Sequence, residues 1–170
     1  MATNSLTGIL VVTLLANLCD ARVLGDRNIP AATQKCPHLW KEYEDNCFLM
    51  YAIPASRADA KKECEEVQGG TLVAILTDRD DEFLESYWNQ TSPFTTDIWI
   101  GLKRNPDNRD EFFWDNDVSL QHTNWIKGEP NDQDTEEDCV VYIRSKYNIG
   151  WNDRECYDYK YPFICMKPRV

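Results

Sequence analysis

Residues 128–139 read GEPNDQDTEEDC, a stretch with six acidic residues and two carboxamides around one proline, closed by a cysteine. Two interpretations are open. A run of charges in a loop often does no more than keep the surface soluble. Alternatively, the oxygens converge on a hard cation such as Ca²⁺, which takes about six to eight oxygen ligands at roughly 2.3–2.6 Å. The rest of the chain decides between them.

The composition describes an acidic globular protein. The chain has 170 residues, of which 42% are hydrophobic, and a formal net charge of −11. Such a chain is long enough to bury a core and is too apolar for a disordered protein. Its charge, which no basic cluster offsets, excludes nucleic acid and anionic membrane surfaces as partners. It suits cations, or ligands that are recognised through cations.

The N-terminus has the features of a secretory signal. Residues 6–18 (LTGILVVTLLANL) are apolar but too few for an easy membrane span, and small residues follow up to Ala21. We therefore expect a signal peptide over residues 1–21, a short flexible leader over 22–35 and a secreted domain over 36–170 without a membrane span. An uncleaved anchor is the alternative, because residues 1–5 contain no Lys or Arg.

The cysteine count supports an extracellular domain. The chain has seven cysteines, and Cys19 would leave with the signal peptide. An even set in a secreted chain predicts three disulfides, although the spacing alone leaves their pairing open. The six remaining residues are Cys36, Cys47, Cys64, Cys139, Cys156 and Cys165.

The pattern of residues predicts an α+β domain. Residues 36–47 favour a hairpin. One helix is expected to begin at Ser56, with Asp59 in its first turn, and a second to begin at Asp78. Further strands or buried extended segments are predicted at 48–51, 72–75, 98–102, 112–114, 139–143 and 162–165, with residues 150–153 facing one of them. Residues 115–138 lack periodicity, which indicates either a functional loop or an element that the pattern does not reveal.

Several features favour binding over catalysis. The chain shows no Ser-His-Asp order, no HExxH motif, no phosphate loop and no free catalytic cysteine, so we expect no enzyme. His38 and His122 are interpreted as structural or surface residues. Asn89 begins the sequon Asn-Gln-Thr and is an expected glycosylation site.

In the order and spacing of its motifs the chain resembles a C-type lectin-like domain. The resemblance runs from Cys36 to Cys165. The motifs are Cys36-Pro-x-x-Trp40, Cys47-Phe48, Cys64, Trp99-Ile-Gly101-Leu102, Asn124-Trp125, Glu129-Pro-Asn131, Glu137-Asp-Cys139, Trp151-Asn-Asp153, Cys156 and Phe163-Ile-Cys165.

The resemblance implies a fold and a pairing of the cysteines. Two helices would pack on small antiparallel sheets, with a long loop held by a disulfide at its base. The implied bridges are Cys36–Cys47, Cys64–Cys165 and Cys139–Cys156. The tryptophans Trp99, Trp114, Trp125 and Trp151 would pack in the core rather than stack on sugars.

The resemblance also implies one Ca²⁺ site that binds sugar directly. Its ligands would be Glu129, Asn131, Glu137, Asn152 and Asp153, with a cis peptide before Pro130. Two neighbouring sugar hydroxyls would complete the coordination and hydrogen-bond to the Glu129–Asn131 and Glu137–Asn152 pairs. The Glu-Pro-Asn order accompanies equatorial 3,4-diols, as in mannose, fucose and N-acetylglucosamine, whereas Gln-Pro-Asp accompanies galactose.

A second, auxiliary cation site is possible on the same grounds. Asp132 and Asp138, together with Glu137, match its usual positions, but Arg109 stands about where a further acid is expected. Asp134 and Glu136 match no ligand position and are interpreted as solvated charge.

The sequence therefore predicts a secreted, calcium-dependent lectin for glycans on cell or microbial surfaces, with a role in innate recognition by analogy. The alternatives are a galactose-binding lectin and a non-sugar member of the family that binds a protein partner or a mineral. The oligomeric state is not indicated.

Overall fold

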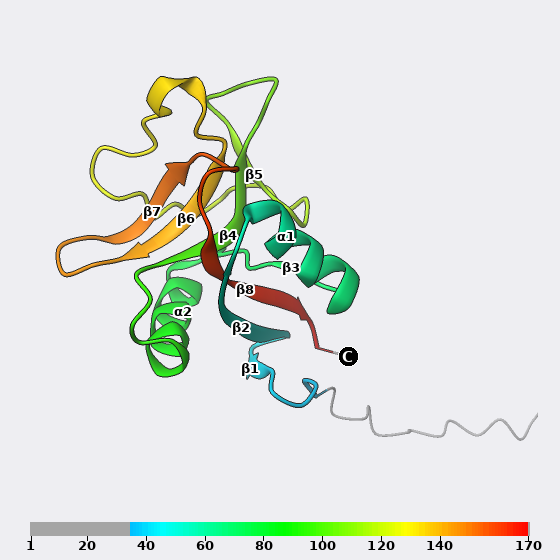
Figure 1. The fold of residues 1–170 in the computed structure, drawn as a ribbon. Helices are drawn as coiled ribbons and strands as arrows, with labels where there is room; N and C mark the ends of the chain where they lie inside the picture. Colours follow the sequence, from blue (N-terminus) through cyan, green and yellow to red (C-terminus); the bar gives the residue numbers. More distant parts are fainter. Residues whose placement is uncertain (1–34, 170) are drawn as a thin grey trace, which may run out of the picture. The chain divides into compact units, whose positions relative to one another are not determined.

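The computed structural model describes residues 35–169 (Figure 1). The expected signal peptide and nearly all of the expected leader lie outside the described residues. Within them the chain is an α+β domain with two α-helices, α1 (Arg57–Lys62) and α2 (Asp78–Thr91). No helix in this part of the chain is long and apolar enough to cross a membrane.

The strands of the described region join into one sheet. They are β1 (Lys41–Tyr43), β2 (Asn46–Ala55), β3 (Thr71–Leu72), β4 (Asp97–Arg104), β5 (Phe112–Trp114), β6 (Cys139–Arg144), β7 (Ile149–Arg154) and β8 (Tyr161–Pro168). Their order is β1-β2-β8-β4-β6-β7, with β3 paired to β8 and β5 to β4. All pairs are antiparallel except β4 with β8, where Trp99 lies opposite Phe163. This contact adds one parallel pair to the antiparallel arrangement that the resemblance implied.

Both helices begin where the sequence predicted. The Ser56 side chain accepts a hydrogen bond from the backbone N–H of Asp59 (3.1 Å), which satisfies a donor that the first turn leaves unpaired. After α1 the chain continues through a π-helical turn, Glu63–Val67. The helical segment ends before Gly69, whose φ of 64° suits glycine. Thr77 caps α2, and acidic residues fill its first turn, where the helix dipole favours negative charge.

The tryptophans form the core, as predicted. Trp99, Trp114 and Trp151 are fully buried, and the partly buried Trp125 packs edge-on against Trp151. None of these four rings is left as an exposed platform for a sugar.

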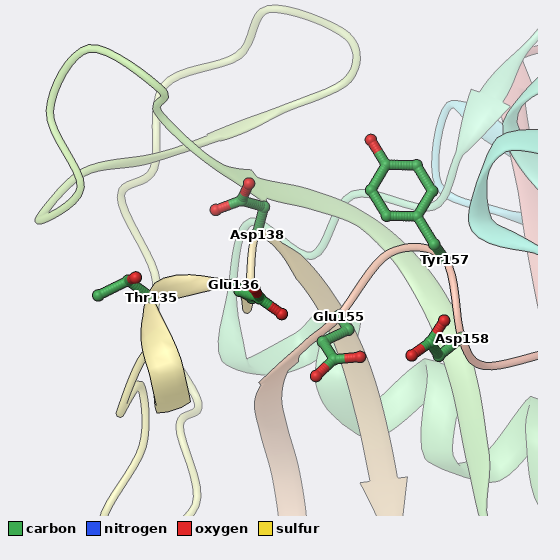
Figure 2. Close-up of a pocket in the computed structure, with 6 residues that line it drawn as sticks. All are labelled: Thr135, Glu136, Asp138, Glu155, Tyr157 and Asp158. Atoms are coloured by element: carbon green, nitrogen blue, oxygen red, sulfur yellow. The ribbon is translucent and has the colours of Figure 1, made fainter.

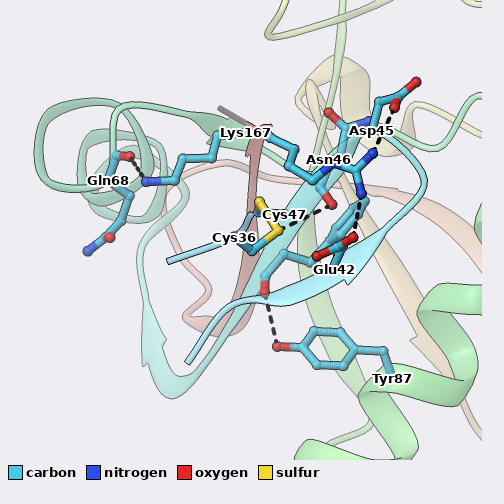
Figure 3. Close-up of a disulfide and its surroundings, with 10 residues drawn as sticks. Cys36, Glu42, Asp45, Asn46, Cys47, Gln68, Tyr87 and Lys167 are labelled. Carbon is cyan, nitrogen blue, oxygen red and sulfur yellow. Dashed lines mark hydrogen bonds and ion pairs between the residues drawn. A yellow bond between two sulfur atoms is a disulfide. The ribbon is translucent and has the colours of Figure 1, made fainter. Parts of the chain in front are cut away.

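Three disulfides confirm the pairing that the resemblance implied. Cys64–Cys165 closes a segment of 101 residues and ties the π-helical turn to β8. Cys139–Cys156 joins the start of β6 to the segment after β7. Cys36–Cys47 anchors the N-terminal end of the domain to β2 (Figure 3). In the same view the Lys167 Nζ donates to the carbonyl of Gln68 (2.9 Å), so the end of β8 is also tied to the segment that follows α1.

The long loop between β5 and β6 has no regular structure beyond a short 3₁₀ turn, η2 (Gln133–Thr135). Figure 1 shows this loop at the end where β7 finishes and β6 begins, away from α2. Backbone hydrogen bonds join it to Trp151, with Ile126 N–H donating to the Trp151 carbonyl (3.0 Å). The approach is close enough that a Cβ at Gly150 would lie 2.4 Å from the Asn124 carbonyl oxygen, so this position needs glycine.

Candidate cation site

Three carboxylates, two from the long loop and one from β7, meet at this end of the sheet. Glu129 lies in the long loop, Glu137 just before β6, and Asp153 on β7. One oxygen from each lies within 4.8 Å of the others. Ligand atoms that are each about 2.4 Å from a shared ion can be at most about 4.8 Å apart, so this cluster fits a hard divalent cation.

Asp153 is the anchor of the cluster. Its side chain is fully buried, and its two oxygens accept hydrogen bonds from the backbone N–H groups of Asn131 (3.2 Å) and Asp132 (2.9 Å). The peptide bond between Glu129 and Pro130 is cis, as the resemblance implied. The turn that carries Glu129 and Asn131 is therefore folded directly onto the end of β7.

The cluster leaves buried acceptors without donors. Glu129 Oε2 and the amide oxygen of Asn152 are buried and have no hydrogen-bond partner within the described region. A buried polar atom left in this state costs about 1–3 kcal/mol, and such atoms are uncommon in native structures. A bound cation would satisfy both oxygens, so the residues present fit such a group.

The two asparagines of the predicted site differ in their surroundings. Asn152 is buried on β7 next to Asp153, whereas Asn131 is exposed at the surface of the loop. Burial raises the pKa of Glu129, and the nearby carboxamide of Asn131 acts in the opposite direction. The structure thus brings the three predicted acids together. Of the two predicted amides, Asn131 lies near Glu129, and Asn152 immediately precedes Asp153 in the chain.

The charges in the cluster oppose one another. Burial raises the pKa of Glu129, and the neighbouring carboxylates of Asp153 and Glu137 raise it further. Burial also raises the pKa of Glu137, although the Gln133 N–H that donates to its carboxylate (3.0 Å) acts in the opposite direction. The ionised cluster is therefore unfavourable alone, and a divalent cation would reverse that cost.

Sequence reasoning missed a buried arginine beside the cluster. The Arg104 guanidinium donates to the carboxylate of Asp153 and to the backbone carbonyl of Glu137 (3.0 Å). Arg104 is only 6% exposed. The sequence did contain a signal for it. Arg104 ends the largely apolar strand DIWIGLKR, and a guanidinium buried at such a position needs carboxylate or carbonyl partners.

Of the acids expected in the auxiliary site, Glu137 belongs to this cluster, whereas Asp132 and Asp138 lie outside it. Asp132 and Asp138 both form ion pairs with Arg109. Asp134 and Glu136 are exposed, in keeping with their interpretation as solvated charge.

A shallow acidic pocket adjoins the cluster (Figure 2). Its volume is about 370 Å³, and it is lined by Thr135, Glu136, Asp138, Glu155, Tyr157 and Asp158. Figure 2 shows the carboxylates of Glu155 and Asp158 close together, and the neighbouring Asp158 carboxyl raises the pKa of Glu155. The Tyr157 ring is 88% exposed. Four carboxylates at this position give the rim of the site a negative potential, which disfavours anionic ligands.

Comparison with known proteins agrees with the fold. The family model of the Lectin C-type domain matches residues 53–167. The chain is 30% identical over 132 residues to C-type lectin BfL-2 of Bungarus fasciatus, covering 77% of this chain and 82% of that protein. It is also 30% identical to a perlucin-like protein of Mytilus galloprovincialis, covering 79% of this chain and 84% of the relative.

Solved structures share the architecture. The C-type lectin CEL-I from Cucumaria echinata superposes with a TM-score of 0.73 at 20% identity, over 80% of this chain and 99% of that one. The cow C-type carbohydrate-recognition domain of CD23, solved in the presence of a GlcNAc2Man3 oligosaccharide, gives a TM-score of 0.70 at 28% identity, over 81% and 98%. A complex of SPL-1 with GlcNAc gives 0.68 at 26% identity, over 78% and 95%. This protein belongs to the C-type lectin family.

Proposed function

We propose that the protein is a secreted, calcium-dependent lectin that binds glycans through equatorial 3,4-diols of the mannose, fucose and N-acetylglucosamine type. The observation that carries the proposal is the convergence of the Glu129, Glu137 and Asp153 carboxylates next to two buried oxygens that lack donors. The repulsion between these carboxylates and the unpaired buried oxygens destabilise the protein when no cation is bound. A cation at this position would bind the oxygens and remove that cost.

The chemistry of the donor set favours Ca²⁺. The ligands would be Glu129, Asn131, Glu137, Asn152 and Asp153, which offer oxygen only, whereas Zn²⁺ prefers His and Cys. When bound, Ca²⁺ supplies a positively charged centre with coordination positions to spare for oxygens of the ligand.

The protein groups around that position can both accept and donate hydrogen bonds. A carboxylate accepts from a sugar hydroxyl, and a carboxamide N–H₂ donates to one. Glu129 with Asn131, and Glu137 with Asn152, supply one carboxylate and one carboxamide each. This pairing, and the Glu-Pro-Asn order, support an equatorial diol. Two similar domains solved with GlcNAc-containing glycans point the same way.

Chromatography on immobilised mannose tests the proposal. The protein should be retained in Ca²⁺ and released by EDTA or by free mannose, but not by galactose. Glu129→Gln should abolish retention, while the matched control Glu136→Gln, at an exposed acid outside the cluster, should be retained like the wild type. Retention that survives EDTA would contradict calcium dependence, and release by galactose alone would favour the galactose-binding alternative.

Secretion and glycosylation are part of the same proposal, with glycans of cell or microbial surfaces as the partners. Asn89 is exposed in the last turn of α2, as a glycosylated residue must be. Protein secreted from eukaryotic cells should begin near residue 22 and should lose mass on treatment with an N-glycosidase. An Asn89→Gln variant should not change on that treatment.

A further inference from the structure

Arg109 occupies the space between the two acids that the sequence assigned to an auxiliary cation. Its Nε donates to Asp132 Oδ2 (2.7 Å), and its Nη2 donates to the other oxygen of the same carboxylate. Its Nη1 lies 2.9 Å from Asp138 Oδ1. All three guanidinium nitrogens therefore face acids of the loop.

This geometry depends on the guanidinium group. The contact with Asp132 is bidentate, which a planar fork of N–H donors allows and a lysine ammonium does not. The pairing with Arg109 also holds the pKa of Asp132 below its usual value. One guanidinium of the same chain thus pairs with both Asp132 and Asp138 and offsets one of their two negative charges.

Arg104 stabilises this arrangement through hydrogen bonds to the backbone. Its guanidinium donates to the backbone carbonyl of Arg109 and, through Nε, to that of Glu137 (3.0 Å). The same Nε lies 3.7 Å from Asp132 Oδ1. Two arginines therefore connect the β4–β5 segment, the acidic loop and the end of β7.

The residues do not fit a second cation. Among the described side chains, Glu129, Glu137 and Asp153 are the one group of three potential acidic, His or Cys ligands close enough to share an ion. Asp132 and Asp138 are not in such a group, and a cation there would have to displace a guanidinium.

We propose that Arg109 takes the place of the auxiliary cation, so that the protein binds a single Ca²⁺ and keeps the acidic loop ordered without calcium. The backbone N–H groups of Asn131 and Asp132 donate to Asp153, so holding the Asp132 side chain also holds these donors. Arg109 is a positioning residue for the cation site. The stoichiometry of one rests on the proposed function, whereas the order of the loop does not.

Hydrogen exchange in EDTA tests the role of Arg109. The amides of Asn131, Asp132, Gln133 and Thr135 donate within the loop or to Asp153 and should be protected in the wild type. Arg109→Gln should accelerate their exchange by about tenfold, because it removes a bidentate, partly exposed ion pair. Arg109→Lys should be intermediate.

The control is Arg79→Gln, which removes the same charge from an exposed position on α2. It should exchange like the wild type. The acceleration in Arg109→Gln should be confined to the loop, since a general loss of stability would also accelerate the amides of β6 and β7. Equal exchange of the loop in the wild type and Arg109→Gln, or acceleration throughout the sheet, would overturn the proposal.

Calorimetric titration with CaCl₂ tests the stoichiometry. One equivalent is expected for the wild type, and two equivalents would overturn the proposal. If no calcium binds, the proposed lectin function fails and the claim of one Ca²⁺ fails with it, while the exchange comparison still decides whether Arg109 orders the loop.

Discussion

Replacing Glu137 with glutamine should stabilise the calcium-free domain and weaken calcium binding at the same time. Glu137 is 6% exposed and lies in the cluster with Glu129 and Asp153. Glutamine keeps the size of the side chain and an oxygen for the Gln133 N–H, but it removes the buried charge. The two effects have opposite signs because calcium is what makes that charge favourable.

The magnitude follows from the distances. Two unit charges 4.8 Å apart repel by about 0.9 kcal/mol in bulk water and by about 3.5 kcal/mol at an effective dielectric constant of about 20. Arg104 beside Asp153, and Arg154 at 3.7 Å from Glu137, offset part of this repulsion. We expect a net gain of about 1–2 kcal/mol, which raises the midpoint of thermal unfolding by about 3–6 °C in a domain of this size.

The loss on the calcium side should be larger. One of three carboxylate ligands becomes neutral, so the affinity for Ca²⁺ should fall by about 10- to 100-fold. In the wild type, calcium at about a hundred times its dissociation constant adds about 2.7 kcal/mol of stability, and at the same calcium concentration this gain should fall to about 0.4–1.4 kcal/mol in Glu137→Gln.

Thermal unfolding followed by circular dichroism, in EDTA and in saturating calcium, measures both effects. Glu136→Gln is the matched control, because it makes the same change in an exposed neighbour and should alter neither midpoint. A lower midpoint for Glu137→Gln in EDTA, or an undiminished shift on adding calcium, would refute the reasoning.

Three further results are expected. The folded-state pKa values of Glu129 and Glu137 are raised, so the calcium-free domain should gain stability as pH falls through these values toward the ordinary pKa of glutamate. The calcium-loaded domain should instead lose stability as pH falls, because protons displace the ion. Midpoints of thermal unfolding measured against pH, in EDTA and in calcium, check both trends. The double variant Glu129→Gln with Asn131→Asp should lose preference for mannose and gain preference for galactose on a glycan array, and a retained mannose preference would contradict the diol assignment. Replacing Cys64 and Cys165 with alanine opens a closed segment of 101 residues and should cost about 4–5 kcal/mol in denaturant unfolding, more than loss of either shorter bridge.

Membership in the C-type lectin family also agrees with the expectation that the protein is not an enzyme, because the Lectin C-type domain is a binding domain and not a catalytic one.

The sequence by itself determined the local elements, since their signals are local. Ser56 and Thr77 cap the helices because a side-chain oxygen a few residues away satisfies the first free N–H groups. The order of the motifs implied the family and, through it, the cysteine pairing that the structure confirms. The π-helical turn after α1 and the parallel contact between β4 and β8 were not predicted, because both depend on packing between distant segments.

Only the tertiary structure decided how the charges are balanced. Residue types and spacing indicated which oxygens are suited to a cation, but Arg104 is 49 residues from Asp153 and Arg109 is 23 residues from Asp132. Electrostatic energy depends on distance in space and on burial, and neither can be read from positions along the chain. The acidic loop taken alone is compatible with one cation or two, and only the tertiary structure reveals the guanidinium that lies against Asp132 and Asp138.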